Sequence, residues 1–440
     1  MTQGKNGAPP RTPPGASPLD PVHKNGFQRQ CLWRGPGAEP RAFRRSVLFA
    51  GTTFAAWAFM PHRAQAAGAR DPRFVTIILR GAMDGLSAVA PVGDPDYAAL
   101  REGIALSKDS GLPLDGFFVL HPAMPNLARL YKSGQATVLH AVATPYRERS
   151  HFNGQDVLES GQPGPGHIAS GWMNRALLAL PKGERVGSHS GLGVGAVTPL
   201  IMRGAAPVLG WAPQGMQKAD DDLASRVVEL YRHRDPQLAE ALSRGLETDR
   251  MARRSGSGDD MRPRGGMDSP AGMQQAAVGA ARLLAQADGP RLAALAFDGW
   301  DTHANEGGAT GRLAQLLGGL DGAFGAFETT LGAAWTDTAI LVVTEFGRTA
   351  HVNGTTGTDH GTGTVAFLVG GAVKGGRVLA DWPGLKADQL YEKRDLRPTT
   401  DVRAVCKGVL AELFGLPAGV LGTAVFPESG AVAPVSGLIG

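Results

Sequence analysis

Five short apolar runs constrain the fold of this chain more than any other feature. They occupy residues 74–79, 136–142, 292–297, 339–343 and 365–369. Each run is continuous rather than alternating and is bounded by turn residues, which is typical of strands buried on both faces. Segments with helical spacing lie between and after them, at residues 124–132, 223–246, 271–287, 313–331 and 400–414, the last with Thr400 as its expected N-cap. This alternation predicts an α/β fold whose central, mostly parallel sheet is flanked by helices on both faces.

The first 66 residues are predicted to be a leader and not part of the fold. Arg44 and Arg45 precede an uncharged run of 15 residues (46–60), and a small-x-small pattern follows at residues 64–66. This order is typical of a secretory signal, and the paired arginines indicate the twin-arginine export machinery as a partner. The run is shorter than the ~20 residues that span a bilayer, so we expect a periplasmic protein without a permanent membrane span. An uncleaved leader that anchors the protein is the alternative.

Residues 67–440 are expected to form one domain, with a polar, glycine-rich mobile loop at about residues 250–270. The leader holds nine Lys and Arg and two Asp and Glu, a net charge of +7, and the whole chain carries +4, so residues 67–440 carry −3. That charge gives no support to nucleic-acid binding. The two cysteines, Cys31 and Cys406, provide neither a disulfide framework nor a cysteine metal motif.

Candidate site residues follow the first two predicted strands. Asp84 comes directly after residues 74–79, where a carboxylate can face a metal ion, although an Asp-Gly turn residue is the simpler interpretation. Ser150 precedes a helical stretch at residues 155–159. Its hydroxyl could therefore lie beside N-terminal amides that stabilise a bound anion, with Arg149 adding charge-assisted contacts. An ordinary N-cap is the alternative for Ser150.

The later strands end in a second set of such residues. Asp301 and His303 follow residues 292–297 and are two positions apart, a spacing that suits two ligands of one divalent ion. Glu345 and Arg348 follow residues 339–343, and the chain returns after a glycine-rich loop with Asp359 and His360. Ligand sites in open α/β sheets lie beyond the carboxyl ends of the strands, and oxygen and nitrogen ligands beside an arginine suit a metal site that handles an anion. For Asp301 and His303 the alternative is a hydrogen-bonded Asp/His turn without metal, and for Arg348 it is a solvent-facing or Glu-paired arginine.

Short motifs at these positions resemble one known family. They cover residues 80–86, 149–152, 301–303, 344–349 and 357–361, in this order within roughly residues 70–430. The set resembles the DUF1501 family, which is largely uncharacterised, is typically exported by the twin-arginine route and is placed in the alkaline phosphatase-like superfamily with sulfatases, phosphomutases and phosphodiesterases. The resemblance implies an alkaline phosphatase-like fold and metal-assisted phosphoryl or sulfuryl transfer.

The resemblance also implies roles for single residues. Asp84 would match the first-strand metal ligand, and Ser150 would match the nucleophile at a helix N-terminus. The other implied ligands are Asp301, His303, Glu345 and His360, with Asp359 beside them. One or two divalent ions (Zn, Ca, Mg or Mn) would be held. The chain departs from the superfamily pattern in the close spacing of its Asp/His pair and at Phe346, where a histidine is frequent, so one metal or a pair with a different ligand set is compatible.

The leading hypothesis is an exported, metal-dependent hydrolase that acts on a small anionic ester of phosphate or sulfate. Ser150 would be the nucleophile, and His151, Arg149 and Arg348 complete the catalytic group. The alternative hypothesis is a non-catalytic exported binding or assembly protein on the same fold, with a structural or vestigial metal site.

Overall fold

The computed structural model describes residues 70–166, 168–181, 191–212, 228, 231–232, 236–254 and 266–440. The predicted leader and residues 255–265 of the predicted loop lie outside this part of the chain. At the start of that loop the chain is still helical, because α8 (Pro236–Arg254) continues through residues 250–254. The helix predicted at residues 223–246 therefore ends later than expected, at Arg254.

One large sheet forms the centre of the described residues. Its strands are β1 (Arg73–Leu79), β5 (Ala136–Ala143), β6 (Gly191–Val194), β7 (Val208–Trp211), β8 (Leu292–Phe297), β9 (Thr338–Thr344), β10 (Thr364–Val369), β11 (Arg377–Leu379) and β12 (Thr400–Asp401). Their order is β11-β5-β10-β9-β1-β8-β6-β7, with β12 beside β5. Only β10 runs antiparallel to its neighbours β5 and β9 among these strands. The predicted mostly parallel α/β sheet is thus confirmed, and all five predicted strands are present.

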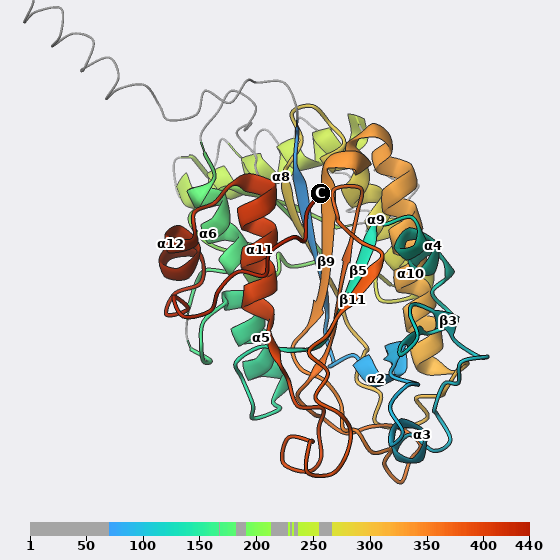
Figure 1. Ribbon diagram of the computed structural model, residues 1–440. Coiled ribbons are helices and arrows are strands. Elements are labelled where there is room, and N and C mark those ends of the chain that lie inside the picture. The colour runs from blue at the N-terminus through green and yellow to red at the C-terminus, as the bar shows by residue number, and fades with distance from the viewer. Residues whose placement is uncertain are drawn as a thin grey trace, which may run out of the picture. The chain divides into compact units, whose positions relative to one another are not determined.

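Helices cover both faces of this sheet (Figure 1). On one face lie α4 (Pro125–Lys132), α9 (Pro270–Leu284) and α10 (Arg312–Leu331), and on the other lie α5 (His151–Ser160), α6 (Trp172–Ala179) and α11 (Val402–Phe414). The short elements are α2 (Gly85–Ala88), α3 (Tyr97–Leu100), α12 (Ala418–Val420) and a small sheet of β2 (Val89–Ala90), β4 (Val119–Leu120) and β3 (Leu112–Pro113). Asp401 caps α11, since its carboxylate accepts from the Arg403 N–H at 2.8 Å, so the prediction of Thr400 as the cap was wrong by one residue. No helix in the described ranges is long and apolar enough to cross a membrane.

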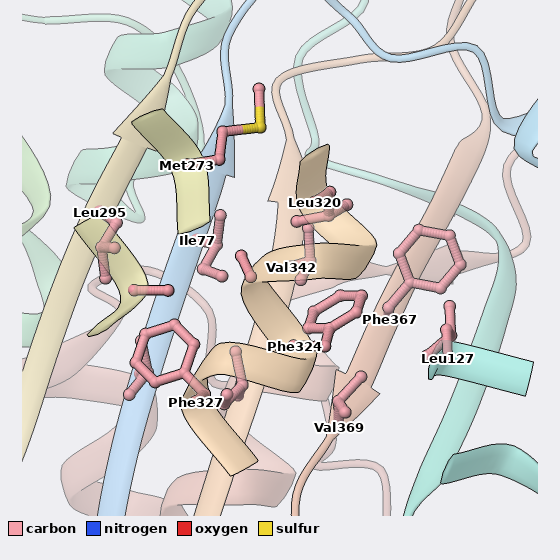
Figure 2. Close-up of a cluster of buried hydrophobic side chains, with 14 of the residues drawn as sticks. Ile77, Leu127, Met273, Leu295, Leu320, Phe324, Phe327, Val342, Phe367 and Val369 are labelled. Atoms are coloured by element: carbon pink, nitrogen blue, oxygen red, sulfur yellow. The ribbon is translucent and has the colours of Figure 1, made fainter. Parts of the chain in front are cut away.

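Alternate side chains of each central strand enter different cores. Ile77 of β1 and Val342 of β9 pack with Phe324 and Phe327 of α10 on one face, as Figure 2 shows. Their sequence neighbours, such as Ile78, belong to the core on the opposite face. Because both faces are covered, these strands are apolar at nearly every position, which is why continuous apolar runs identified them.

Candidate metal centre

The edge of the sheet where β1, β5, β8 and β9 end carries most of the predicted site residues. Parallel strands end at the same edge, so the loops that follow them meet there. Since β10 is antiparallel to β5 and β9, this edge holds its first residues and the loop before it. Asp301 and His303 arrive after β8, His151 after β5, and His360 shortly before β10.

Three imidazoles and one carboxylate converge at this edge and are called the His/Asp cluster: His151, His303, His360 and Asp301. The Nε2 atom of His360 lies 2.9 Å from Nε2 of His151 and 2.9 Å from Nε2 of His303. The Asp301 carboxylate lies 3.1 Å from His303 Nε2, 3.4 Å from His360 Nε2 and 3.5 Å from His151 Nε2. Coordinating atoms of His151, Asp301 and His360 all lie within 4.8 Å of one another, so these groups could hold a metal ion.

The spacing and the donor atoms of the His/Asp cluster fit a divalent ion. Zinc–nitrogen bonds of about 2.0–2.1 Å in a tetrahedron place neighbouring ligand atoms about 3.3 Å apart. Among His151, His360 and Asp301 the separations are 2.9, 3.4 and 3.5 Å, and His303 lies 2.9 Å from His360 and 3.1 Å from Asp301. A neutral His360 has one Nε2 lone pair but faces two other Nε2 atoms, and a cation bound at His360 Nε2 removes this conflict.

Each imidazole is oriented through its other ring nitrogen. Nδ1 of His151 lies 2.8 Å from Glu345 Oε1, and Nδ1 of His303 lies 3.1 Å from Asp359 Oδ1. Nδ1 of His360 lies 3.1 Å from the carbonyl oxygen of Arg149. Donation from Nδ1 leaves Nε2 free to bind a metal, which is the usual arrangement of histidine ligands and their outer partners. Glu345 and Asp359, which were predicted as ligands, lie at the Nδ1 atoms of His151 and His303, on the side of each ring away from the other cluster members.

The electrostatics of the metal-free cluster follow from these contacts. The hydrogen bond that His151 donates to the Glu345 carboxylate is the main cause that raises the pKa of His151. Burial, followed by the charges of His151 and Arg348, lowers the pKa of His360. Burial alone would raise the pKa of Glu345, but its hydrogen bonds, first that with His151, hold it below its ordinary value. Of the two facing rings in the metal-free cluster, His151 is therefore the more readily protonated.

Arg348 is buried and contacts the His/Asp cluster through Asp301. Its guanidinium is 1% exposed and donates to the carbonyls of Ala82 at 2.7 Å, Gly81 at 2.7 Å and Thr358 at 3.0 Å. It also forms an ion pair with Asp301. Although burial opposes ionisation, the Arg348 charge lowers the pKa of Asp301. The anion-binding role predicted for Arg348 is thus replaced by the positioning of Asp301, because its donors are already paired.

The guanidinium and the backbone carbonyl of Arg149 both make polar contacts with other residues. The guanidinium donates to Asp395 at 2.8 Å and to Glu392 at 2.5 Å. Its backbone has a φ of +58°, a left-handed conformation that is uncommon for a residue with a side chain and that aims the carbonyl at His360. The structure therefore places Arg149 as an orienting partner of His360, and not as a free cation.

Asp84 lies apart from the His/Asp cluster. Its carboxylate accepts from the N–H groups of Leu86 at 2.9 Å and Ser87 at 3.2 Å, and so caps α2. It also pairs with Arg101, which is fully buried. No hydrogen bond or ion pair within the described residues joins Asp84 to the three histidines. A strand-end carboxylate followed by glycine could be a ligand or a cap, and this one is a cap.

Ser150 occupies the N-cap position of α5, directly before His151. Its side chain makes no capping hydrogen bond, so its hydroxyl and the first N–H groups of the helix are left for another partner. Its conformation (φ −97°, ψ 125°) is that of an ordinary N-cap. The structure brings the predicted nucleophile to the helix end that carries one of the histidines.

Two buried residues of this region were not predicted. Arg101 and Glu306 form, with Asp84, a group called here the buried triad: Arg101 lies 3.7 Å from Glu306 and pairs with Asp84. Glu306 also accepts from Thr302 and Thr358, the neighbours of predicted ligands. The one signal in the sequence was a glutamate three residues after His303, which alone does not distinguish a buried partner from a surface residue.

Comparison with known proteins gives a family and remote structural likenesses. No curated protein matches the chain. Similar solved structures include Ps i-CgsB in complex with k-i-k-neocarrahexaose, at 12% identity and a TM-score of 0.41 over 83% of this chain and 75% of that one. Another is the phosphonate monoester hydrolase of Agrobacterium radiobacter, at 13% identity and a TM-score of 0.31 over 79% and 74%. Likenesses this remote carry no argument about activity.

The family match is more extensive. The family described as "Protein of unknown function (DUF1501)" matches residues 130–424, which include the loops after β5, β8 and β9 and the loop before β10. The match covers well over half of the chain, and the protein belongs to the DUF1501 family.

Proposed function

We propose that this protein is an exported, metal-dependent hydrolase of phosphate or sulfate esters. The observation that carries the proposal is the convergence of His151, His303, His360 and Asp301, with every imidazole oriented through Nδ1 by an oxygen. A set of three nitrogens and one oxygen favours zinc or a similar transition metal over calcium and magnesium, which prefer oxygen ligands alone. Export through the twin-arginine route to the periplasm is part of this proposal and rests on the leader.

The residues of the chain have distinct roles in this scheme. A bound divalent ion would act as a Lewis acid on the ester. Ser150, whose hydroxyl has no capping bond, is proposed as the nucleophile. The uncapped N-terminus of α5 would bind the anionic oxygens of the ester, because its N–H groups and the helix dipole favour negative charge. Arg348 and Glu345 hold Asp301 and His151 in place and have no direct contact with substrate in this scheme.

The alternative function also has an observation in its favour. His303 lies within 3.1 Å of Asp301 and His360, and as a fourth ligand it would close the site, as is typical of structural metals. Against this, the side chains of Asp301 and His303 are 40% and 44% exposed, so solvent and a small ester can reach the cluster. An accessible centre, with the uncapped hydroxyl of Ser150 next in sequence to His151, favours catalysis over a purely structural or vestigial site.

A Ser150→Ala variant tests the proposal directly. Metal-loaded wild-type protein is expected to hydrolyse an aryl phosphate or aryl sulfate, and the variant is expected to lose that turnover while it keeps the metal content and melting temperature of the wild type. Thr423→Ala, which removes an exposed hydroxyl far along the chain, is the matched control. Full turnover in Ser150→Ala would exclude the nucleophile, and a metal-loaded wild type without turnover would favour the binding or assembly protein.

A further inference from the structure

A buried carboxyl group links the two loops that carry the His/Asp cluster. Glu306 is completely buried in the loop between β8 and α10. Its Oε2 accepts hydrogen bonds from Thr302 Oγ1 at 3.1 Å and from Thr358 Oγ1 at 2.7 Å. Thr302 stands between two members of the cluster, and Thr358 is two residues before His360. One carboxyl group therefore touches both ligand-bearing loops.

The backbones of these two loops are also in direct contact. The Thr358 N–H donates to the Thr302 carbonyl at 3.1 Å, and the Glu306 N–H donates to the Thr356 carbonyl at 3.1 Å. A Cβ atom placed on Gly357 would lie 2.4 Å from the backbone of His303. Because the loops touch without free space, a shift of either loop moves the ligands on the other.

The charge state of Glu306 follows from its surroundings. Its Oε1 accepts no hydrogen bond, and Arg101, which lies 3.7 Å away, is already paired with Asp84. Two buried carboxyl groups thus face one guanidinium. Burial, together with the charge of Asp84, raises the pKa of Glu306 to about 8, so Glu306 is protonated at neutral pH. The protonated group can donate a hydrogen bond to Asp84.

We propose that Glu306, through its hydrogen bonds to Thr302 and Thr358, is a positioning residue that fixes the loop of Asp301 and His303 against the loop of His360. Glu306 accepts a hydrogen bond from one threonine hydroxyl on each loop and donates one towards Asp84. These contacts together fix the separation of the metal ligands on the two loops. This inference rests on the metal centre of the proposed function and does not depend on hydrolysis.

Binding of Co²⁺ to the full-length protein tests the proposal, because the visible spectrum of the bound ion reports its coordination geometry. Glu306→Gln keeps a neutral group that can accept from both threonines and donate to Asp84, so its affinity and spectrum should match the wild type. Glu306→Ala should bind Co²⁺ about tenfold to hundredfold more weakly, as is typical when an outer partner of a metal site is lost, and its spectrum should change. Glu412→Ala is the matched control, since that carboxylate accepts from three N–H groups at the C-terminus instead.

Two results would overturn the proposal: wild-type affinity and spectrum in Glu306→Ala, or a loss in Glu306→Gln as large as that in Glu306→Ala. Should Glu306→Ala fail to fold, Thr302→Val and Thr358→Val each remove one hydroxyl at similar volume. Wild-type Co²⁺ binding in both would contradict the inference just as firmly. A wild type that binds Co²⁺ but hydrolyses no ester contradicts only the proposed function, whereas a wild type that binds no Co²⁺ contradicts both.

Discussion

Replacing Glu345 by glutamine is expected to weaken metal binding at the His/Asp cluster while the protein stays folded. Oε1 of Glu345 accepts from His151 Nδ1 at 2.8 Å, from the Gly81 N–H at 2.9 Å and from Gln155 Nε2 at 3.1 Å. A glutamine oxygen can keep these three bonds, and its nitrogen can donate to Thr344 Oγ1, which lies 2.9 Å from Oε2. The variant therefore removes a negative charge with little change in packing.

The size of the effect follows from the role of Glu345 as the outer partner of His151. Mutation of such a partner typically lowers metal affinity about tenfold to hundredfold, equivalent to ~1.4 to ~2.7 kcal/mol of binding free energy, and here the lost negative charge is the cause. A chelator-competition titration with Zn²⁺ measures it. Glu159→Gln is the control, because this carboxylate is also buried on α5 but pairs with Arg80. Unchanged affinity in Glu345→Gln, or an equal loss in Glu159→Gln, would refute the reasoning.

The metal-free protein gives a second readout of the same variant. Glu345 raises the pKa of His151 above 6.5, so the stabilisation from the charged pair is fully present below pH 6.5 and is lost as the pH rises through the raised value. The wild type should therefore exceed Glu345→Gln in unfolding free energy most strongly on the acid side. Denaturant unfolding at several pH values measures this difference, and a gap that widened on the alkaline side would contradict the assignment.

Three further perturbations test the surroundings of the centre. Gly357→Ala should lower both the melting temperature and the bound zinc per chain, since its Cβ would lie 2.4 Å from the backbone of His303; equal zinc content in variant and wild type would contradict this. Arg101→Met should lower the free energy of unfolding by about 3–5 kcal/mol, because it leaves a buried carboxylate of the buried triad without its cation. Denaturant unfolding measures this, and a decrease below ~1 kcal/mol would contradict the prediction, because it would mean that no unpaired buried charge remains. Burial lowers the pKa of His140 to about 4. The free energy of unfolding should therefore fall by up to roughly 3 kcal/mol as the pH drops from 6.5 towards 4, and His140→Phe should reduce this pH dependence. The same pH dependence in the wild type and in His140→Phe would contradict the prediction.

Much of the fold could be predicted because its central strands are buried on both faces. Runs such as residues 74–79 and 339–343 have no polar alternation, and only a covered, mostly parallel sheet explains them. The strands β6 and β7 escaped prediction because they are four residues long and contain glycine, so their pattern resembles that of a loop. They are strands because β8 provides an edge to pair with, which is tertiary information.

The candidate site could be predicted by position but not by role. Strand ends correctly indicated that His303, His360 and Asp301 would gather at one edge of the sheet. Whether a carboxylate lies at an Nε2 atom, as Asp301 does, or at an Nδ1 atom, as Glu345 and Asp359 do, depends on side-chain direction, which residue type and spacing do not encode. Glu345 and Asp359 were predicted as ligands for this reason, and His151 was predicted as a catalytic group although it belongs to the group that could hold a metal ion.

Because β10 is reversed, one short segment of the chain supplies both a histidine of the candidate metal centre and two of its outer carboxylates. The chain leaves β9 and re-enters the sheet at the same edge, through 19 residues (345–363) that include His360 and the partners of two other histidines. By contrast, 194 residues separate His151 from Glu345. Short loops close at a lower entropic cost than long ones. The segment between β9 and β10 can therefore adopt its conformation before the distant parts of the chain pack against it. The arrangement of the His/Asp cluster is complete only after those parts have packed. Correct geometry at the cluster is then a measure of whether the whole sheet has formed.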